Sequence, residues 1–130
     1  MREANVALLK RGYQAFGEAD LETVRKMGTK DEVWHTLGFG PFRPEYTGPD
    51  DVTAYLTELM ISSDGTFKSE PETFAADDED HVVVLEHITA TRKGRKLDTH
   101  VVHDFRVEDG KIAEVTEYAS EPTKIRDFWS

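Results

Sequence analysis

The strongest constraint on the fold is a run of three strand-like segments in the second half of the chain. They are Val82–Arg92, Leu97–Glu108 and Ile112–Tyr118, and two short polar turns join them. The second turn contains Asp109-Gly110, an acid-glycine pair that supplies the positive φ that tight hairpins need. Segments joined by such turns pair as antiparallel neighbours. This half of the chain therefore predicts the centre of an antiparallel sheet.

Three helices are predicted before these strands. Apolar residues recur at helical spacing in three places, Asp20 is a suitable cap for the second helix, and Pro49 suits the start of the third. Their inner faces are Val6, Leu9, Tyr13 and Phe16; Leu21, Val24 and Met27; and Val52, Tyr55, Leu56, Leu59 and Met60. Helices followed by antiparallel strands indicate an α+β fold. We expect one domain over residues 1–130, with three N-terminal helices packed on a curved antiparallel sheet around an apolar, cone-shaped interior.

Two further segments read as extended. Asp31–Thr36 predicts a short strand, and Thr66–Phe74 predicts a strand that Pro71 confines to an edge or a bulge. Between them, Gly38–Pro49 is rich in glycine and proline and therefore predicts a loop.

Composition excludes several classes of partner. The formal net charge of −10 repels nucleic acid and anionic membranes. The chain has no cysteine, which excludes disulfides and thiolate metal sites. No apolar run approaches the ~20 residues that a membrane-spanning helix needs. We expect a soluble, cytoplasmic protein that binds neither nucleic acid nor membrane.

Several short pieces of the sequence, taken in order, carry a resemblance to a known family. They are Tyr13 and Phe16 before Ala19-Asp20-Leu21; Asp31-Glu32-Val33-Trp34-His35; Tyr46-Thr47-Gly48; Val102-His103-Asp104-Phe105-Arg106-Val107-Glu108-Asp109-Gly110-Lys111-Ile112; Glu117-Tyr118; and Phe128-Trp129. In this order and spacing the chain resembles the SnoaL-like polyketide cyclases and ketosteroid-isomerase-related proteins of the nuclear-transport-factor-like superfamily. The resemblance implies a cystatin-like cone and a homodimer formed through the sheet. Members differ widely in activity, so the fold alone says little about the reaction.

The resemblance also implies positions for catalytic groups. Ketosteroid isomerases carry a carboxylate base at the end of the strand after the second helix, where this chain has His35. They carry a protonated aspartic acid on the long middle strand, where this chain has His103. Their tyrosine on the first helix corresponds to about Gly12, one residue before Tyr13. The isomerase triad is absent as such, which argues against steroid isomerisation.

The two histidines are the first candidate catalytic residues. If His103 faces the cone, Val101 and Phe105 share its side of the strand, and the imidazole could stabilise an enolate or exchange a proton near neutral pH. His35 lies beside Trp34, whose apolar ring would lower the histidine pKa and keep it neutral as a general base. The alternative for each histidine is a structural role, with hydrogen bonds to a neighbouring strand, a water or loop backbone.

Glu86 and Glu117 are the next candidates, and two arrangements of their strands are open. In the first, both carboxylates face the cone and form a proton-transfer cluster with His103 across adjacent strands. In the second, the faces are reversed, Thr116 and Tyr118 are buried, and both acids lie in water. General burial statistics favour the second arrangement, because a carboxylate in an apolar interior is costly unless it is paired or protonated.

The remaining candidates would shape a substrate pocket. They are aromatic or apolar residues on the predicted inner faces: Tyr13, Phe16, Trp34, Tyr55, Val101, Phe105 and Trp129. His100 and His103 lie three apart on a strand and so point to opposite faces, which disfavours a metal site. No phosphate-binding loop or nucleophile elbow is present. We therefore expect no metal and no cofactor.

These features favour a small cofactor-independent enzyme. It would be an isomerase, cyclase or lyase that transfers protons on an apolar, carbonyl-bearing small molecule; a hydrolase variant would use the same groups to position water. The alternative is a non-catalytic module of the same fold that only holds a small ligand or only dimerises. A homodimer through the sheet would place Val102 and His100 at the interface.

Overall fold

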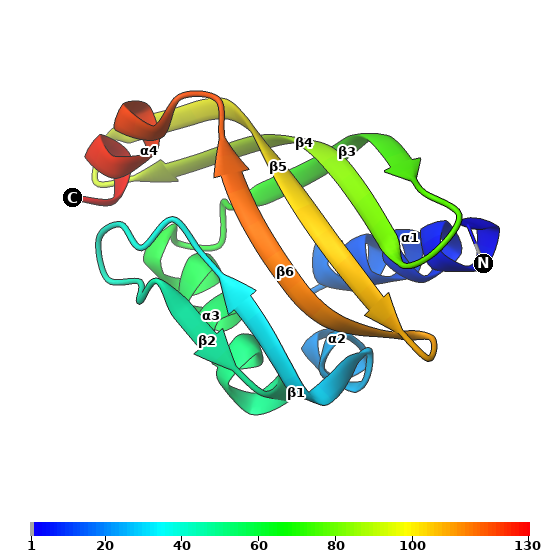
Figure 1. The fold of residues 1–130 in the computed structure, drawn as a ribbon. Coiled ribbons are helices and arrows are strands. Elements are labelled where there is room, and N and C mark those ends of the chain that lie inside the picture. Colours follow the sequence, from blue (N-terminus) through cyan, green and yellow to red (C-terminus); the bar gives the residue numbers. More distant parts are fainter. Residues whose placement is uncertain (1) are drawn as a thin grey trace.

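A curved sheet and the helices that cover one of its faces form two layers (Figure 1). The structure is a computed structural model that describes residues 2–130. Along the chain the elements are α1 (Arg2–Gly17), α2 (Leu21–Lys26), β1 (Gly28–His35), β2 (Glu45–Thr47), α3 (Pro49–Ser62), β3 (Lys68–Ala76), β4 (His81–Arg92), β5 (Arg95–Glu108), β6 (Lys111–Ala119) and α4 (Pro122–Trp129). The α+β prediction is therefore confirmed.

The predicted meander is present at the centre of the sheet. The strand order is β2-β1-β6-β5-β4-β3, and the four strands from β3 to β6 pair antiparallel with their neighbours. The turns before β5 and β6 use positive φ at Lys93-Gly94 and Asp109-Gly110, as tight hairpins require. These local turns fix the register of β4, β5 and β6.

The sheet is mixed, which corrects the expectation of a wholly antiparallel one. β1 pairs parallel with β6 on one side and antiparallel with β2 on the other. The chain leaves α2 at the end of the sheet where β6 begins, and the N–H of Ile112 donates to the carbonyl of Met27 at 2.8 Å. Both strands then run the same way. β2 lies inside the segment predicted as a loop, and its three residues are too few to give a strand pattern.

The predicted starts of the second and third helices hold, α2 ends at Lys26 so that Met27 only caps it, and a fourth helix is added. The Asp20 side chain accepts from the backbone N–H of Thr23 at the start of α2, and Pro49 occupies the first turn of α3. α4 at the C-terminal end was not predicted; it brings Phe128 and Trp129 into the core. In β3, the pairing with β4 shifts between Pro71 and Thr73, so this edge strand carries the predicted irregularity.

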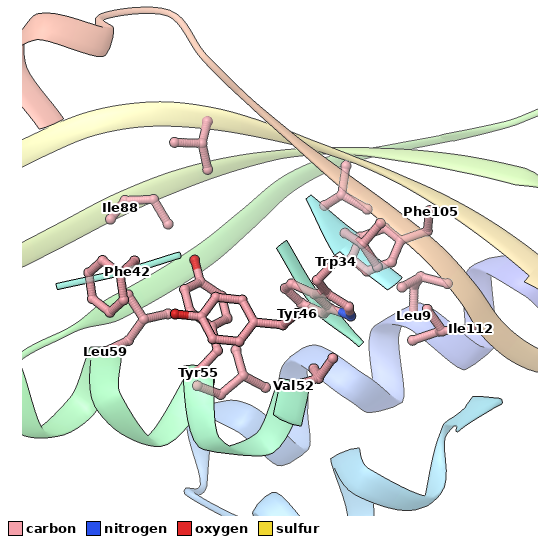
Figure 2. Packing of buried hydrophobic residues seen from close by; sticks show 14 of the residues in the cluster. Leu9, Trp34, Phe42, Tyr46, Val52, Tyr55, Leu59, Ile88, Phe105 and Ile112 are labelled. Carbon is pink, nitrogen blue, oxygen red and sulfur yellow. The ribbon is translucent and has the colours of Figure 1, made fainter. Parts of the chain in front are cut away.

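The core lies between the inner face of the sheet and α1 to α3 (Figure 1). Figure 2 shows aromatic side chains at its centre, where Trp34, Tyr55 and Phe42 lie between the strands and α3. Trp34 packs against Tyr55 with ring centroids 6.0 Å apart, and Phe42 meets Trp129 edge-on at 4.9 Å. Across residues 2–130, the structure contains no helix with both the length and the apolar character needed to cross a bilayer.

Candidate functional site

A cavity of about 130 Å³ lies inside the cone. Aromatic and aliphatic side chains from the helices, the sheet and the C-terminal end form most of its wall. One part of the wall is polar and is formed by Tyr13, Tyr55, Ser69, Glu86, His103 and Glu117. We call these six residues the polar cluster. They come from six different elements, one residue each from α1, α3, β3, β4, β5 and β6.

His103 is the centre of the polar cluster. Alternation along β5 turns its side chain inward together with Val101 and Phe105, and all three are buried. Its Nδ1 contacts Glu86 Oε2 in a short hydrogen bond, and its Nε2 lies 3.0 Å from Glu117 Oε2. β5 lies between β4 and β6, so the imidazole bridges a carboxylate from each neighbouring strand.

The two carboxylates keep this imidazole protonated. Burial alone would lower the pKa of His103, but the negative charge of Glu86 and the hydrogen bonds with both carboxylates outweigh it and raise the pKa to about 10. Burial likewise tends to raise the pKa of Glu86, yet His103, Ser69 and Tyr13 together hold that pKa below its usual value. At neutral pH the cluster therefore contains an imidazolium and an ionised Glu86.

Neutral hydroxyl groups complete the network around the carboxylates. The Tyr13 hydroxyl donates to Glu86 Oε2 at 2.6 Å, and the Tyr55 hydroxyl donates to Glu117 Oε2 at 2.8 Å. The Ser69 hydroxyl donates to Glu86 Oε1 at 2.6 Å. Burial and the neighbouring carboxylates raise the pKa of both tyrosines well above the usual value. Both phenols therefore stay protonated and act as donors.

Glu86 and Glu117 thus adopt the inward arrangement, not the exposed one that general statistics favour. Only 2% of Glu86 is exposed, and the Glu117 side chain is 11% exposed. The desolvation cost is offset because each carboxylate pairs with His103 and accepts further hydrogen bonds. Thr116 and Tyr118 consequently lie on the outer face, where Tyr118 is 55% exposed.

His35 lies outside the cavity, which corrects the expectation that two imidazoles meet inside the cone. Neighbouring residues of a strand point to opposite faces, and β1 turns Trp34 inward. His35 therefore points outward, where its Nε2 lies 2.8 Å from Glu114 Oε2 and its Nδ1 lies 3.5 Å from Glu45. Its side chain is 36% exposed.

The residues predicted to shape the pocket all line the cavity; they are Tyr13, Phe16, Trp34, Tyr55, Val101, Phe105 and Trp129. The ring of Trp34 lies 5.8 Å from that of His103, centroid to centroid, in a tilted arrangement. Ser69 was missed. A serine two residues before Pro71 on an edge strand carries no signal of a buried role, and only the fold brings it to Glu86.

No obvious metal centre accompanies this cluster. Within the part of the chain that the structure describes, no three His, Asp or Glu side chains are placed to hold a metal ion. What the arrangement offers is proton chemistry: two buried carboxylates share one imidazolium at the wall of an apolar cavity, and two phenols stand beside them.

Comparison with known proteins places this geometry in context. The SnoaL-like domain family matches residues 9–115. The structure of Bal32a, from a soil-derived mobile gene cassette, is 25% identical, with 99% of this chain and 98% of Bal32a covered and a TM-score of 0.95. A Xanthomonas campestris protein of unknown function with a cystatin-like fold is 27% identical, with coverage of 100% and 99% and a TM-score of 0.89.

A more distant structure shares the fold alone. It is a protein from Jannaschia sp. CCS1 assigned to the SnoaL-like polyketide cyclases, and it is 15% identical with a TM-score of 0.81. The alignment covers 100% of this chain and 94% of that protein. The cone architecture is therefore retained where little of the sequence is.

Proposed function

The chain belongs to the SnoaL-like domain family, and on that premise we propose that it is a cofactor-independent enzyme that transfers protons on a small apolar molecule. The observation that carries the proposal is the buried Glu86–His103–Glu117 bridge at the wall of the cavity. A buried carboxylate that is held in place but keeps accepting capacity is a suitable general base.

Glu117 is the base in this proposal. It is less buried than Glu86, and its Oε1 is held only by a long hydrogen bond of 3.3 Å from the backbone N–H of Leu37. It would remove a proton from the carbon next to a substrate carbonyl, and the electrons of that C–H bond would move onto the carbonyl oxygen. His103, as a fixed imidazolium, would stabilise this negative charge through its positive charge rather than by a direct hydrogen bond, because both of its ring nitrogens are paired with carboxylates. Returning the proton at another atom completes an isomerisation, a cyclisation or an elimination.

Proton exchange into simple ketones tests the proposal without knowledge of the natural substrate. The protein is incubated in D₂O with a panel of small cyclic ketones, with and without a hydroxyl group, and deuterium at the carbon beside the carbonyl is followed by NMR. We expect exchange above the buffer rate. Glu117→Gln should lower the rate by about 10²–10⁴-fold, the usual contribution of a general base. His103→Gln should also lower it.

A matched control lies on the same strand. Glu114 is on the outer face of β6 and pairs with His35 and Arg106, away from the cavity. Glu114→Gln should exchange ketone protons at the wild-type rate. Full activity in a folded Glu117→Gln variant, or no exchange for any ketone with the folded wild-type protein, would refute the proposed reaction.

The second candidate is a non-catalytic ligand-binding module. One observation favours it: the donors of the polar cluster are already satisfied by the two carboxylates, as in a structural network. Under this alternative the wild-type protein would hold a small molecule in the cavity and show no exchange.

We also propose that the chain works as a homodimer in the cytoplasm. Support for the dimer is the outer face of the sheet, where Tyr118 is 55% and Val83 38% exposed beside His100 and Val102. Light scattering coupled to size exclusion measures the mass directly. A mass of one chain at micromolar concentration would contradict the dimer and leave the proposed reaction untouched.

A further inference from the structure

We propose that the substrate of this cavity is an uncharged molecule of about one ring that presents a hydroxyl group to the carboxylates of the polar cluster. This inference rests on the proposed function and adds a hydroxyl to the carbonyl that the reaction needs. Three properties of the site point to such a molecule: the direction of its hydrogen bonds, its charge and its volume.

The donors of the polar cluster are occupied. His103 has a carboxylate on each ring nitrogen, and Tyr13, Tyr55 and Ser69 each donate to a carboxylate. A ligand that can only accept, such as a simple ketone, must break one of these bonds to obtain a donor from the cluster.

Two further side-chain donors border the cavity. The Thr36 hydroxyl donates to the carbonyl of Arg43, and the other donor is on Trp34. Its buried indole N–H makes no hydrogen bond of normal geometry with residues 2–130. It lies close enough to the Glu32 carboxyl to oppose the rise that burial causes in the pKa of that group. The indole N–H therefore lies near Glu32, which is outside the cavity wall.

The carboxylates of the polar cluster can still accept hydrogen bonds. An ionised carboxylate has about four lone-pair sites. Glu86 accepts from His103, Tyr13 and Ser69. Glu117 accepts from His103, Tyr55 and the backbone N–H of Leu37. Each carboxylate can therefore take about one more donor. A substrate hydroxyl fits this vacancy, because its hydrogen can be given to a carboxylate without disturbing the network.

The charge of the cluster excludes anionic ligands. Two carboxylates and one imidazolium leave a formal charge of −1. Among the described residues that line the cavity there is no lysine or arginine to balance it. A ligand carboxylate would have to lose its hydration and meet a like charge in an apolar cavity. An uncharged ligand avoids both costs.

The volume limits the ligand to about one ring. A cavity of about 150 Å³ with apolar walls holds one benzene molecule, and this cavity measures about 130 Å³. Leu59, Ile88 and Phe105 are among its walls. They are buried in the core, so we expect the enclosed part of the cavity not to take a second ring without rearrangement.

Four ring compounds test the three properties by isothermal titration calorimetry. Cyclohexanol, cyclohexanone and cyclohexanecarboxylate have the same ring and differ in the polar group, and 2-decalol adds a second ring. We expect cyclohexanol to bind about tenfold more tightly than cyclohexanone, since one hydrogen bond to a charged group distinguishes them. Cyclohexanecarboxylate should bind most weakly of the three, and 2-decalol at least tenfold more weakly than cyclohexanol.

Two variants test whether the Glu117 carboxylate causes the preference for cyclohexanol over cyclohexanone. Glu117→Gln offers amide N–H donors and removes one negative charge, so the preference for cyclohexanol over cyclohexanone should fall to near unity or reverse. Glu114→Gln, on the outer face of the same strand, should keep the wild-type order. If Glu117→Gln fails to fold, Tyr55→Phe provides the second test: it frees accepting capacity on Glu117 and should strengthen cyclohexanol binding relative to cyclohexanone.

The outcomes separate this inference from the proposed function. Equal or tighter binding of cyclohexanone or cyclohexanecarboxylate would overturn the hydroxyl preference, even if deuterium exchange into ketones is rapid. Tighter binding of 2-decalol than of cyclohexanol would overturn the size limit. The expected order of binding without any deuterium exchange would support the ligand class and refute the enzyme.

Discussion

Glu32 provides the sharpest test of the energetics, because it is a buried carboxyl outside the polar cluster. It lies on β1 and is 3% exposed. Its carboxyl packs over Gly28 so closely that a Cβ at that glycine would come within 2.2 Å of it. Burial raises its pKa to about 7, and the nearby Trp34 indole only partly opposes this rise. We predict that Glu32→Gln, which keeps the shape and removes the charge, stabilises the protein at high pH.

The sign and size of this change in stability follow from the raised pKa of Glu32. Unfolded, the carboxyl has a pKa near 4.5; folded, it has one of about 7. The folded state therefore holds the proton more tightly, and the protein loses stability as the pH rises between these two values. A shift from 4.5 to about 7 corresponds to roughly 3 kcal/mol once the pH exceeds the folded-state pKa. Below the unfolded-state pKa this penalty is absent.

Urea denaturation at pH 8 and at pH 5 measures the effect. The free energy of unfolding of Glu32→Gln should exceed that of the wild type by about 1–3 kcal/mol at pH 8. At pH 5 the gain should be much smaller. Asp31→Asn alters the neighbouring exposed carboxyl on the same strand and should change little at either pH. A Glu32→Gln variant that is equally or less stable than the wild type at pH 8 would refute this account of the buried carboxyl.

Three further substitutions test other contacts. Tyr55→Phe removes a hydrogen bond to a charged group and should lower the free energy of unfolding in urea by about 1.5–3 kcal/mol; an unchanged value would mean that the bond adds nothing. Gly28→Ala places a methyl group within 2.2 Å of the Glu32 carboxyl, and should cost about 1–3 kcal/mol. In a double-mutant cycle Glu32→Ala should recover part of that loss, and strict additivity would contradict the contact. Gly40→Ala combines a φ of +61° with a Cβ position 2.6 Å from the Trp129 carbonyl; it should lower the Tm, and an unchanged Tm would count against this close approach.

Local signals predicted the parts of the fold that local chemistry determines. The turn at Asp109-Gly110, the cap at Asp20 and the helix start at Pro49 each depend on residues close in sequence, and each is where we expected it. The parallel pairing of β1 with β6 joins segments far apart in the chain. No short pattern specifies such a pairing, and the sheet was accordingly predicted with the wrong direction at this point.

In the candidate site, too, local patterns predicted some features, whereas contacts between distant residues decided the others. Alternation along β5 predicted which residues accompany His103, but it could not choose the inner face for Glu86 and Glu117. That choice depends on partners such as Tyr13, 73 residues from Glu86, and Tyr55, 62 residues from Glu117. His35 was assigned to the cavity by position along the chain, whereas the alternation that sends Trp34 inward sends it outward.

The C-terminal helix has a practical consequence for handling the protein. Ile125 and Trp129 form part of the cavity wall, and the backbone carbonyl of Ser130 accepts hydrogen bonds of 3.0 Å from both Arg92 and Arg95. A purification tag fused after Ser130 is expected to weaken these hydrogen bonds and so to disturb the cavity wall. α1 begins far from α4 (Figure 1), so tags and surface-immobilisation linkers are better placed before α1.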